Sequence, residues 1–150
     1  MTESDDRDAR PLVEAAEQAR VFGVVRQAHQ LEVAEDYVEL IGDLIEAKGE
    51  ARIVDLAERL GISQPTVNKT VARLQREGYV TSEPYRSIFL TDSGRELATR
   101  SRARHDVVVA FLQAIGVSED TAVQDAEGVE HHVSEETLAA FQKIIDEKSG

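Results

Sequence analysis

The sequence predicts a mainly α-helical protein, with an N-terminal winged helix-turn-helix followed by a second, wholly helical module. Residues 51–90 alternate helical and strand-like segments in the order of a winged helix. A long helical segment begins near residue 93, and two further helical segments follow it. A chain of 150 residues can hold two small domains. We place a disordered tail at 1–10, the N-terminal helices and winged helix-turn-helix at 11–92, and the helical module at 93–150.

Two helices are expected ahead of the helix-turn-helix. Apolar residues recur at helical spacing from Pro11 to His29, and again from Leu31 to Ala47. Gly49 marks the end of the second helix. The ten residues before Pro11 are polar and acidic and have no such periodicity, which predicts disorder.

The most regular pattern lies between residues 51 and 90. A short helix over residues 53–60 is stopped by Gly61, and Ser63 is a good N-cap for the next helix. Pro65 falls in the first turn of that helix, where its missing N–H costs nothing. The helix continues to Gly78, and two short strands then form a hairpin, or wing, at 79–81 and 88–90.

Polar side chains in the first turns of the second helix are candidates for DNA contact, because that part of a recognition helix reaches base edges and phosphates. The arginine at the tip of the wing is placed for phosphate or minor-groove contact. A winged helix that binds protein instead of DNA is the alternative. The candidate DNA-binding residues are Ser63, Gln64, Pro65, Thr66, Asn68, Lys69, Arg73 and Arg86.

The charge distribution supports a DNA-binding segment despite a net charge of −12. Within residues 51–104, ten Lys or Arg side chains stand against six Asp or Glu, so this segment carries +4 and the remainder −16. A local basic surface matters more for phosphate contact than the global sum. The acidic remainder is where a cation would be attracted.

The helical module opens with Ser93 and Glu96, whose spacing resembles a capping box. The long helix that follows is apolar on almost all sides from Val107 to Leu112, and such a segment must be buried on more than one side. We therefore expect a homodimer held largely by residues 107–115. Gly116 ends this helix, and Ser118 and Ser134 are expected to cap two more.

Three groups of acids and histidines predict a metal site. Glu127, Glu130 and His131 stand at i, i+3 and i+4, so they share one helical face with Cβ atoms about 5–6 Å apart. Asp36 and Glu39 share another face, and His105 lies on the long helix. Together the six could supply oxygen and nitrogen ligands from three helices, although acids and histidines on a solvated surface are the alternative. His132 is interpreted as a plain polar or supporting residue, and His29 as a residue without partners.

Five segments make the chain resemble the manganese transport regulators of the diphtheria-toxin-repressor superfamily, also called iron-dependent repressors, which are metal-dependent transcription factors. The resemblance covers residues 30–146, about four-fifths of the chain, and the last segment is close to a signature of the group. These segments are Asp36–Ile41, Gln64–Lys69, Tyr85–Thr91, Arg104–His105 and Asp125–His132.

The resemblance implies a homodimer that binds a double-stranded DNA operator, mainly as a repressor of metal-uptake or metal-homeostasis genes. It implies two Mn²⁺ ions per protomer, and the six ligands are those nominated above. Iron-responsive members of the superfamily carry sulfur ligands where this chain has Asp36 and Glu127, and a site rich in carboxylate oxygen favours manganese. Metal would join the DNA-binding module to the helical module and so fix the dimer for operator binding.

Several other classes of protein are disfavoured. The chain has no Cys, so disulfides and thiolate metal sites are excluded, and it has neither a signal-peptide h-region nor an apolar run of about 18 residues. We expect a soluble, cytoplasmic protein without a membrane partner. A regulator that senses a small organic ligand, or another divalent metal such as iron, remains the alternative. An enzyme is not expected, because a di-iron helical bundle would need two Glu-x-x-His pairs and no nucleophile or phosphate-loop motif occurs.

Overall fold

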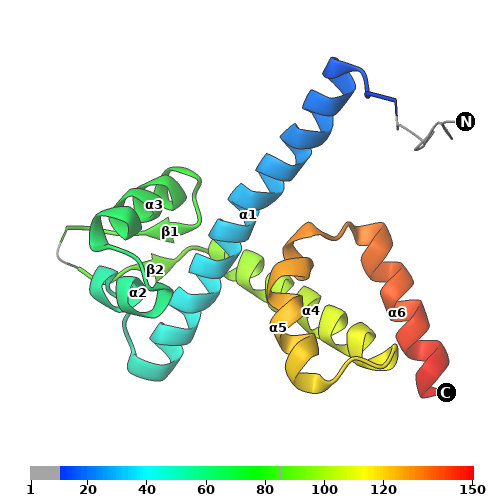
Figure 1. Cartoon of the computed structure of the whole chain (residues 1–150). Coiled ribbons are helices and arrows are strands. Elements are labelled where there is room, and N and C mark those ends of the chain that lie inside the picture. The colour runs from blue at the N-terminus through cyan, green and yellow to red at the C-terminus, as the bar shows by residue number, and fades with distance from the viewer. Residues whose placement is uncertain (1–10, 85) are drawn as a thin grey trace, which may run out of the picture.

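The computed structural model describes residues 11–84 and 86–150 and confirms the predicted fold class. A winged helix lies on one side of the long helix α1 and a three-helix module lies on the other (Figure 1). The expected tail of residues 1–10 lies outside the described residues. The elements are α1 (Ala15–Lys48), α2 (Ile53–Leu60), α3 (Gln64–Arg76), β1 (Val80–Thr81), β2 (Phe89–Leu90), α4 (Asp92–Ala114), α5 (Glu119–Val129), the 3-10 turn η1 (Glu130–His132) and α6 (Glu135–Ser149).

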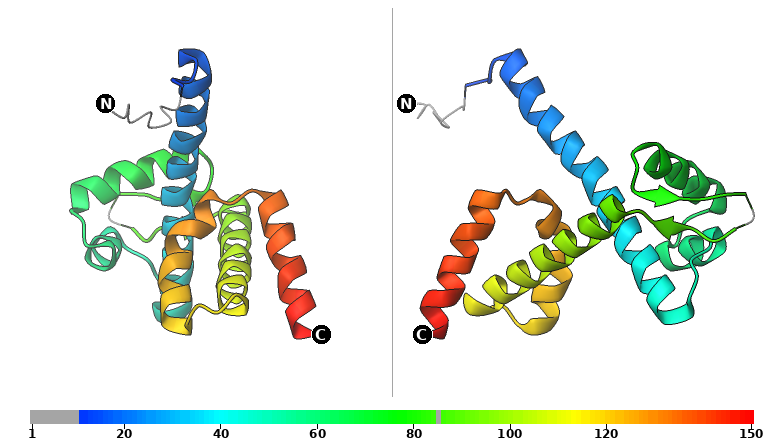
Figure 2. Two further views of the ribbon diagram at one scale, coloured as in Figure 1. Left: turned by 45° about the vertical axis from the view of Figure 1, so that its right-hand side comes forward. Right: turned by 180° about the vertical axis from the view of Figure 1, so that it is seen from behind.

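The first helix is continuous, and the prediction of two helices there was wrong. α1 runs for 34 residues through the expected break between His29 and Leu31. Neither a Gly nor a Pro stands at that point, so nothing interrupts the backbone hydrogen bonds. The N-terminal half of α1 projects away from both modules (Figure 2) and leaves Val21 and Phe22 exposed.

The winged helix follows the predicted pattern. Gly61 ends α2 with a φ of 69°, and the Ser63 side chain caps α3 by accepting a hydrogen bond from the Thr66 N–H at 3.3 Å. β1 and β2 pair antiparallel, with Val80 opposite Leu90. The core of this module is formed by the C-terminal half of α1 together with α2, α3, the wing and the first turns of α4, through Val38, Ile41, Leu44, Leu56, Val67, Val71, Leu74, Val80, Ile88 and Leu97.

Helix α4 begins at a different cap from the one predicted. Thr91, and not Ser93, is the N-cap: its hydroxyl accepts a hydrogen bond from the Gly94 N–H at 3.1 Å and donates one to the Gly78 carbonyl at 2.6 Å. The second bond connects the start of α4 to Gly78, in the turn that follows α3. Among the described residues, Ser93 makes no comparable side-chain hydrogen bond. This close approach leaves no room at Gly94, where a Cβ atom would lie 2.1 Å from the Tyr79 carbonyl oxygen.

We expect Gly94→Ala to lower the free energy of unfolding by about 1–3 kcal/mol, because the methyl group would force α4 away from the wing. Gly128→Ala is the matched control: within the described residues nothing lies within 4 Å of its Cβ position, so it should change stability by about 1 kcal/mol or less. Urea unfolding followed by circular dichroism measures both. Equal stabilities of the two variants would contradict this account of the α4–wing contact.

The C-terminal module has a small core of its own. Val108, Ala122 and Ala126 are fully buried, and the rings of Phe111 and Phe141 stack at 3.9 Å between α4 and α6. Most of the apolar run of α4 is only half-buried, and Ile115 is exposed. Among the described residues, no helix is both long and apolar enough to cross a membrane.

Candidate metal centre

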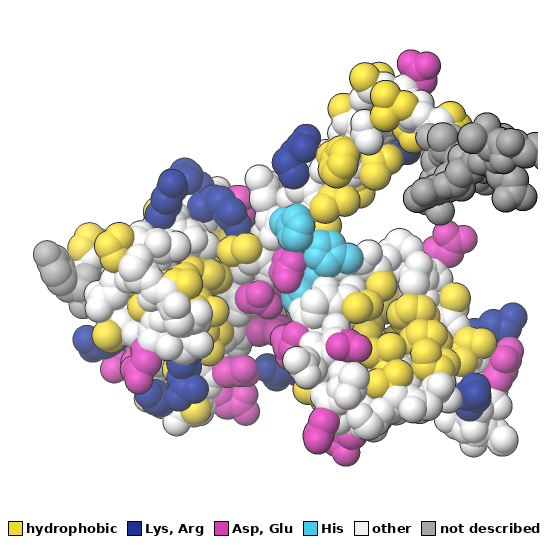
Figure 3. All heavy atoms as spheres, viewed as in Figure 1, with side chains coloured by type: hydrophobic (Ala, Val, Ile, Leu, Met, Phe, Trp, Pro, Cys, Tyr) yellow, Lys and Arg dark blue, Asp and Glu magenta, His cyan; other side chains and the backbone are white. Residues whose placement is uncertain are grey.

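The six predicted metal ligands come from elements that contact one another, namely α1, α4 and the α5–η1 segment. Asp36 and Glu39 come from α1, His105 comes from α4, and the other three come from α5 and η1. Figure 3 shows acidic side chains and histidines gathered between the winged helix and the C-terminal module. The centre therefore lies at the junction of the two modules.

Glu130 stands between the two histidines. One of its carboxylate oxygens is 2.5 Å from Nδ1 of His105, and the other is 3.3 Å from Nε2 of His131. The same Nε2 is 3.4 Å from a carboxylate oxygen of Asp36. Nδ1 of His105 is also 4.0 Å from Glu127. These distances join five of the six predicted residues into one cluster.

Glu39 interacts electrostatically with two residues of this cluster, Asp36 and Glu127. Burial raises the pKa of Glu39, and the negative charges of Asp36 and Glu127 act in the same direction. A carboxylate in this position is disfavoured by its acidic neighbours unless a cation sits between them. The four acids are thus close enough to influence one another.

The α5–η1 segment differs from the single helical face expected for Glu127, Glu130 and His131. α5 ends at Val129, and the chain then winds into the 3-10 turn η1. The tighter turn carries Glu130 and His131 into the interior, where their side chains are 2% and 0% exposed, while Glu127 stays at the surface with 65% exposure. Glu130 and His131 therefore lie on a 3-10 turn and not on the expected α-helix, but Glu127 and Glu130 both approach His105, so the three side chains still face the same region.

His131 is held by Glu35, a residue that the sequence interpretation missed. The Glu35 carboxylate accepts a hydrogen bond from Nδ1 of His131 at 2.7 Å. Ser101 donates to the same carboxylate at 3.2 Å, and Arg104 lies 3.5 Å from its other oxygen. An acid that holds one imidazole nitrogen orients the other toward a metal. Glu35 could have been noticed as an acid on the stripe of α1 that carries Val38.

The other nitrogen of His131 faces the cluster without an aligned partner. Nε2 is buried and has no hydrogen-bond partner among the described residues, although carboxylates of Asp36 and Glu130 lie nearby. Burial disfavours the charged imidazole, but the nearby carboxylates of Asp36 and Glu35 outweigh it and raise the pKa of His131 to about 10. Burial likewise raises the pKa of Glu130 to about 6, against the opposing influence of His105 and His131.

This donor set fits a divalent cation. Four carboxylates and two imidazoles converge from three directions, and hard oxygen donors with some imidazole suit ions such as Mn²⁺. The unpaired Nε2 of His131 aims between two carboxylates, and Glu35 supports the ring from behind. An ion at that point would take the place of the Nε2 proton.

A second group of ligand-type side chains lies beside the first. Nδ1 of His29 is 3.4 Å from a Glu32 carboxylate oxygen, and Nε2 of His132 is 3.1 Å from the same oxygen. The two imidazole rings meet edge to face at 5.1 Å. The interpretation of His29 as a residue without partners was wrong, because it pairs with Glu32 on the same helix and its ring meets that of His132, which lies on η1 about a hundred residues away in the sequence.

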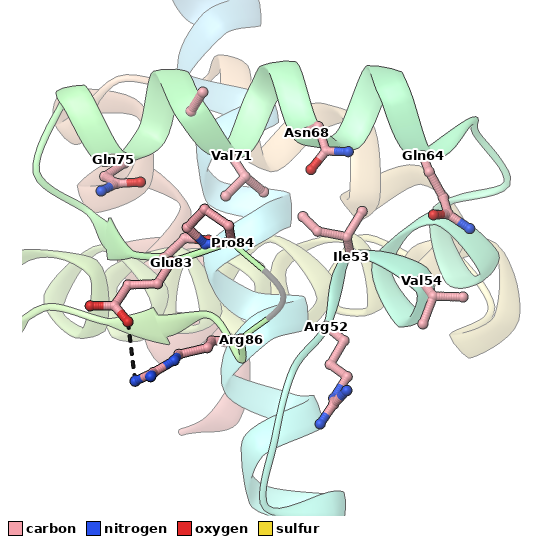
Figure 4. Close-up of a pocket in the computed structure, with 12 residues that line it drawn as sticks. Arg52, Ile53, Val54, Gln64, Asn68, Val71, Gln75, Glu83, Pro84 and Arg86 are labelled. Atoms are coloured by element: carbon pink, nitrogen blue, oxygen red, sulfur yellow. Dashed lines mark ion pairs between the residues drawn. The ribbon is translucent and has the colours of Figure 1, made fainter.

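A groove between α3 and the wing is lined by three of the eight predicted DNA-contacting residues. Gln64 and Asn68 project into it from α3, and Arg86 borders it from the wing (Figure 4). Arg86 lies 3.2 Å from Glu83 and is otherwise exposed. Lys69 is exposed on α3. Gln75 and Arg52, which the sequence interpretation did not single out, also line the groove.

The remaining predicted DNA residues have other surroundings. Ser63 and Thr66 hydrogen-bond to each other at 2.9 Å in the first turn of α3, next to Pro65. Arg73 is half-buried and turns toward α1, where it donates to the Gln30 carbonyl at 3.4 Å. Its Nε also lies 3.4 Å from Glu77. Arg73 therefore joins α3 to α1, and the DNA contact predicted for it stays a prediction.

Comparison with known proteins divides the chain into two family domains. Residues 29–88 match "Iron dependent repressor, N-terminal DNA binding domain", and residues 91–148 match "Iron dependent repressor, metal binding and dimerisation domain". The chain is 52% identical over 139 residues to "Transcriptional regulator MntR" of Escherichia coli O6:H1, covering 93% of this chain and 89% of that protein.

A second relative and a solved structure have similar descriptions. The protein of the same description from Salmonella typhimurium is 54% identical over 130 residues, covering 87% of this chain and 83% of that protein. A solved structure described as "Manganese-dependent transcriptional repressor complex with manganese" is 30% identical, with a TM-score of 0.66 over 75% of this chain. This chain spans about half the length of that solved chain, at 52%.

Proposed function

The chain belongs to the iron-dependent repressor family, and from this premise we propose that it is a manganese-responsive, DNA-binding transcriptional regulator, mainly a repressor, that acts as a homodimer. The two relatives from Escherichia coli and Salmonella typhimurium are named as transcriptional regulators. The observation that carries the proposal is the buried Nε2 of His131, which lies near the carboxylates of Asp36 and Glu130 but has no hydrogen-bond partner in the described part of the chain.

The proposed ligands are Asp36, Glu39, His105, Glu127, Glu130 and His131, with two Mn²⁺ ions per protomer. When bound, two such ions supply +4 against the −4 of the four carboxylates. Glu35 orients His131 from behind, and the two oxygens of Glu130 reach one histidine each. With two ions in place, these carboxylates could approach one another without the repulsion that adds to burial in raising the pKa of Glu39.

The ligands join the two modules, and this is how metal would control DNA binding. The part of α1 that carries Asp36 and Glu39 also packs through Val38 and Ile41 into the winged-helix core. The other four ligands come from α4, α5 and η1. Fixing α1 against these elements sets the position of α3 relative to the dimerisation module, for which we keep the boundaries 11–92 and 93–150.

We propose that the half-buried apolar run of α4, residues 107–115, forms much of the dimer interface. Val108 is fully buried within one protomer, whereas Ile115 is 52% exposed and no residue of α6 among those described is fully buried. A second copy would cover these side chains. Dimers of helix-turn-helix proteins place two recognition helices one DNA turn apart, about 34–36 Å.

A selection experiment tests the proposed function without knowledge of the operator. The full chain is incubated with a library of random-sequence DNA duplexes, either with Mn²⁺ or with a chelator, and the bound duplexes are sequenced. We expect a two-fold symmetric sequence to be enriched with Mn²⁺ and not with the chelator. Enrichment of the same sequence under both conditions would contradict a metal-responsive regulator and favour a sensor of another ligand.

We expect the affinity for Mn²⁺ to rise with pH. Because the pKa of His131 is raised to about 10, its imidazole is protonated near neutral pH, and metal must displace that proton. One released proton gives a rise of about tenfold per pH unit between about pH 6.5 and 8.5. Below about pH 6 the slope should steepen, because Glu130 is then protonated as well. Calorimetric titration in buffers with different ionisation enthalpies counts the protons, and an affinity independent of pH would contradict the proposal.

A further inference from the structure

We propose that His29, Glu32 and His132 form a separate site for a divalent cation that prefers nitrogen ligands, with Zn²⁺ as the best-fitting ion. The site lies next to the proposed manganese centre but uses none of its six ligands. It contains the two histidines of the chain that the manganese centre leaves unused.

The three side chains converge on one point. Each offers one ligand atom, and these three atoms all lie within 4.8 Å of one another. Glu32 is central, because one of its oxygens is 3.4 Å from Nδ1 of His29 and 3.1 Å from Nε2 of His132. The two histidines come from elements far apart in the sequence, α1 and η1, so their meeting is a property of the fold.

These distances match the spacing of ligands around zinc. Zinc binds imidazole nitrogen at about 2.0–2.1 Å and carboxylate oxygen at about 2.0–2.2 Å in tetrahedral geometry, so neighbouring ligand atoms are about 3.3–3.6 Å apart. Both distances to Glu32 lie near this range. The His29 and His132 side chains are 64% and 35% exposed, so both rings are free to make the small rotation that brings their nitrogens to the same spacing.

The ligand types separate this site from the manganese centre. Two imidazoles and one carboxylate make a nitrogen-rich set that favours Zn²⁺, Cu²⁺ or Ni²⁺ over Mn²⁺. Zinc sites with three protein ligands keep a fourth position for water. Here the fourth position faces a surface pocket that Asp125 and Gly128 also line, together with the apolar Leu112, Val129 and Val133.

The site would add a second link between α1 and η1. On α1, Glu32 precedes Asp36 by four residues, and on η1, His132 directly follows His131, so the two sites lie one helical turn apart. Glu32 also comes close to the manganese centre. Glu32, Asp36 and His131 each offer one ligand atom, and these three atoms lie within 4.8 Å of one another. Zinc bound by Glu32 would thus hold the same two elements that the manganese ligands join.

The test compares metal content in the full chain. Wild type, His29→Ala and His132→Gln are dialysed against Zn²⁺, and separately against Mn²⁺, and the metal bound per protomer is measured by mass spectrometry. We expect each variant to lose one Zn²⁺ per protomer and to keep the wild-type amount of Mn²⁺. Co²⁺ in place of Zn²⁺ should give a visible absorption band of four-coordinate cobalt that weakens in both variants.

Glu130→Gln is the matched control, because it removes a ligand of the manganese centre alone. It should lose Mn²⁺ but keep the Zn²⁺ that His29→Ala loses, which separates failure of this proposal from failure of the proposed function. An unchanged zinc content in His29→Ala would overturn the separate site, and would mean that the three side chains only hydrogen-bond to one another. Loss of Mn²⁺ together with Zn²⁺ in His29→Ala would also overturn it, by making His29 part of the manganese centre.

Discussion

Replacing His131 by alanine is expected to abolish manganese-dependent DNA binding while the winged helix stays folded. The imidazole is fully buried and stands between Glu35 on one side and Asp36 and Glu130 on the other. Its loss removes a ligand and takes away the imidazole that these three acids share. If metal and DNA binding are coupled by about 1–3 kcal/mol, loss of the metal lowers DNA affinity about 5–150-fold.

The measurement is fluorescence anisotropy of a selected DNA duplex across a Mn²⁺ titration. Glu35→Gln should give an intermediate result, with metal affinity about 10–100-fold lower, because the ligand remains but loses its orienting carboxylate. Glu136→Gln, an exposed acid on α6, is the matched control and should behave as wild type. A His131→Ala protein that still responds to Mn²⁺ as wild type does would place the metal elsewhere.

The second large effect is expected on α3, where Asn68→Ala and Lys69→Ala should weaken DNA binding without loss of metal. Asn68 projects into the groove between α3 and the wing, and loss of a base contact there should cost about 1–3 kcal/mol and relax specificity (Figure 4). Lys69 is exposed and has no ligand of the metal centre on its helix. Its loss should reduce the dependence of log K on log salt by about one unit.

Arg73→Ala should behave differently, because its side chain joins α3 to α1 through the Gln30 carbonyl and also pairs with Glu77 at the end of α3. We expect lower stability in urea and an unchanged salt dependence of DNA binding. Anisotropy at several salt concentrations, with unfolding measured on the same samples, separates the two cases. A reduced salt dependence at unchanged stability would assign Arg73 to the DNA surface after all.

The sequence by itself determined the features that depend on near neighbours. The ends of the two helices in the helix-turn-helix were predictable at Gly61, Ser63 and Gly78, because helix caps and left-handed turns depend on a few adjacent residues. The types of ligand in the metal centre were also readable, since acids and histidines at helical spacing indicate divalent cations. A local prediction was wrong where a contact with another element decided the outcome. The hydrogen bond from Thr91 to the Gly78 carbonyl makes Thr91 the N-cap of α4 in place of Ser93.

Only the tertiary structure decided which side chains meet across the modules. Glu35 and His131 are 96 residues apart, and Glu32 and His132 are 100 apart, so no local pattern relates them. The inward turn of Arg73 and the 3-10 winding of Glu130 and His131 likewise follow from packing against α1 and α4. Helical periodicity indicates which residues share a face of a helix. Which other element contacts that face depends on how the helices pack, and this packing brings together the residues of both proposed metal sites.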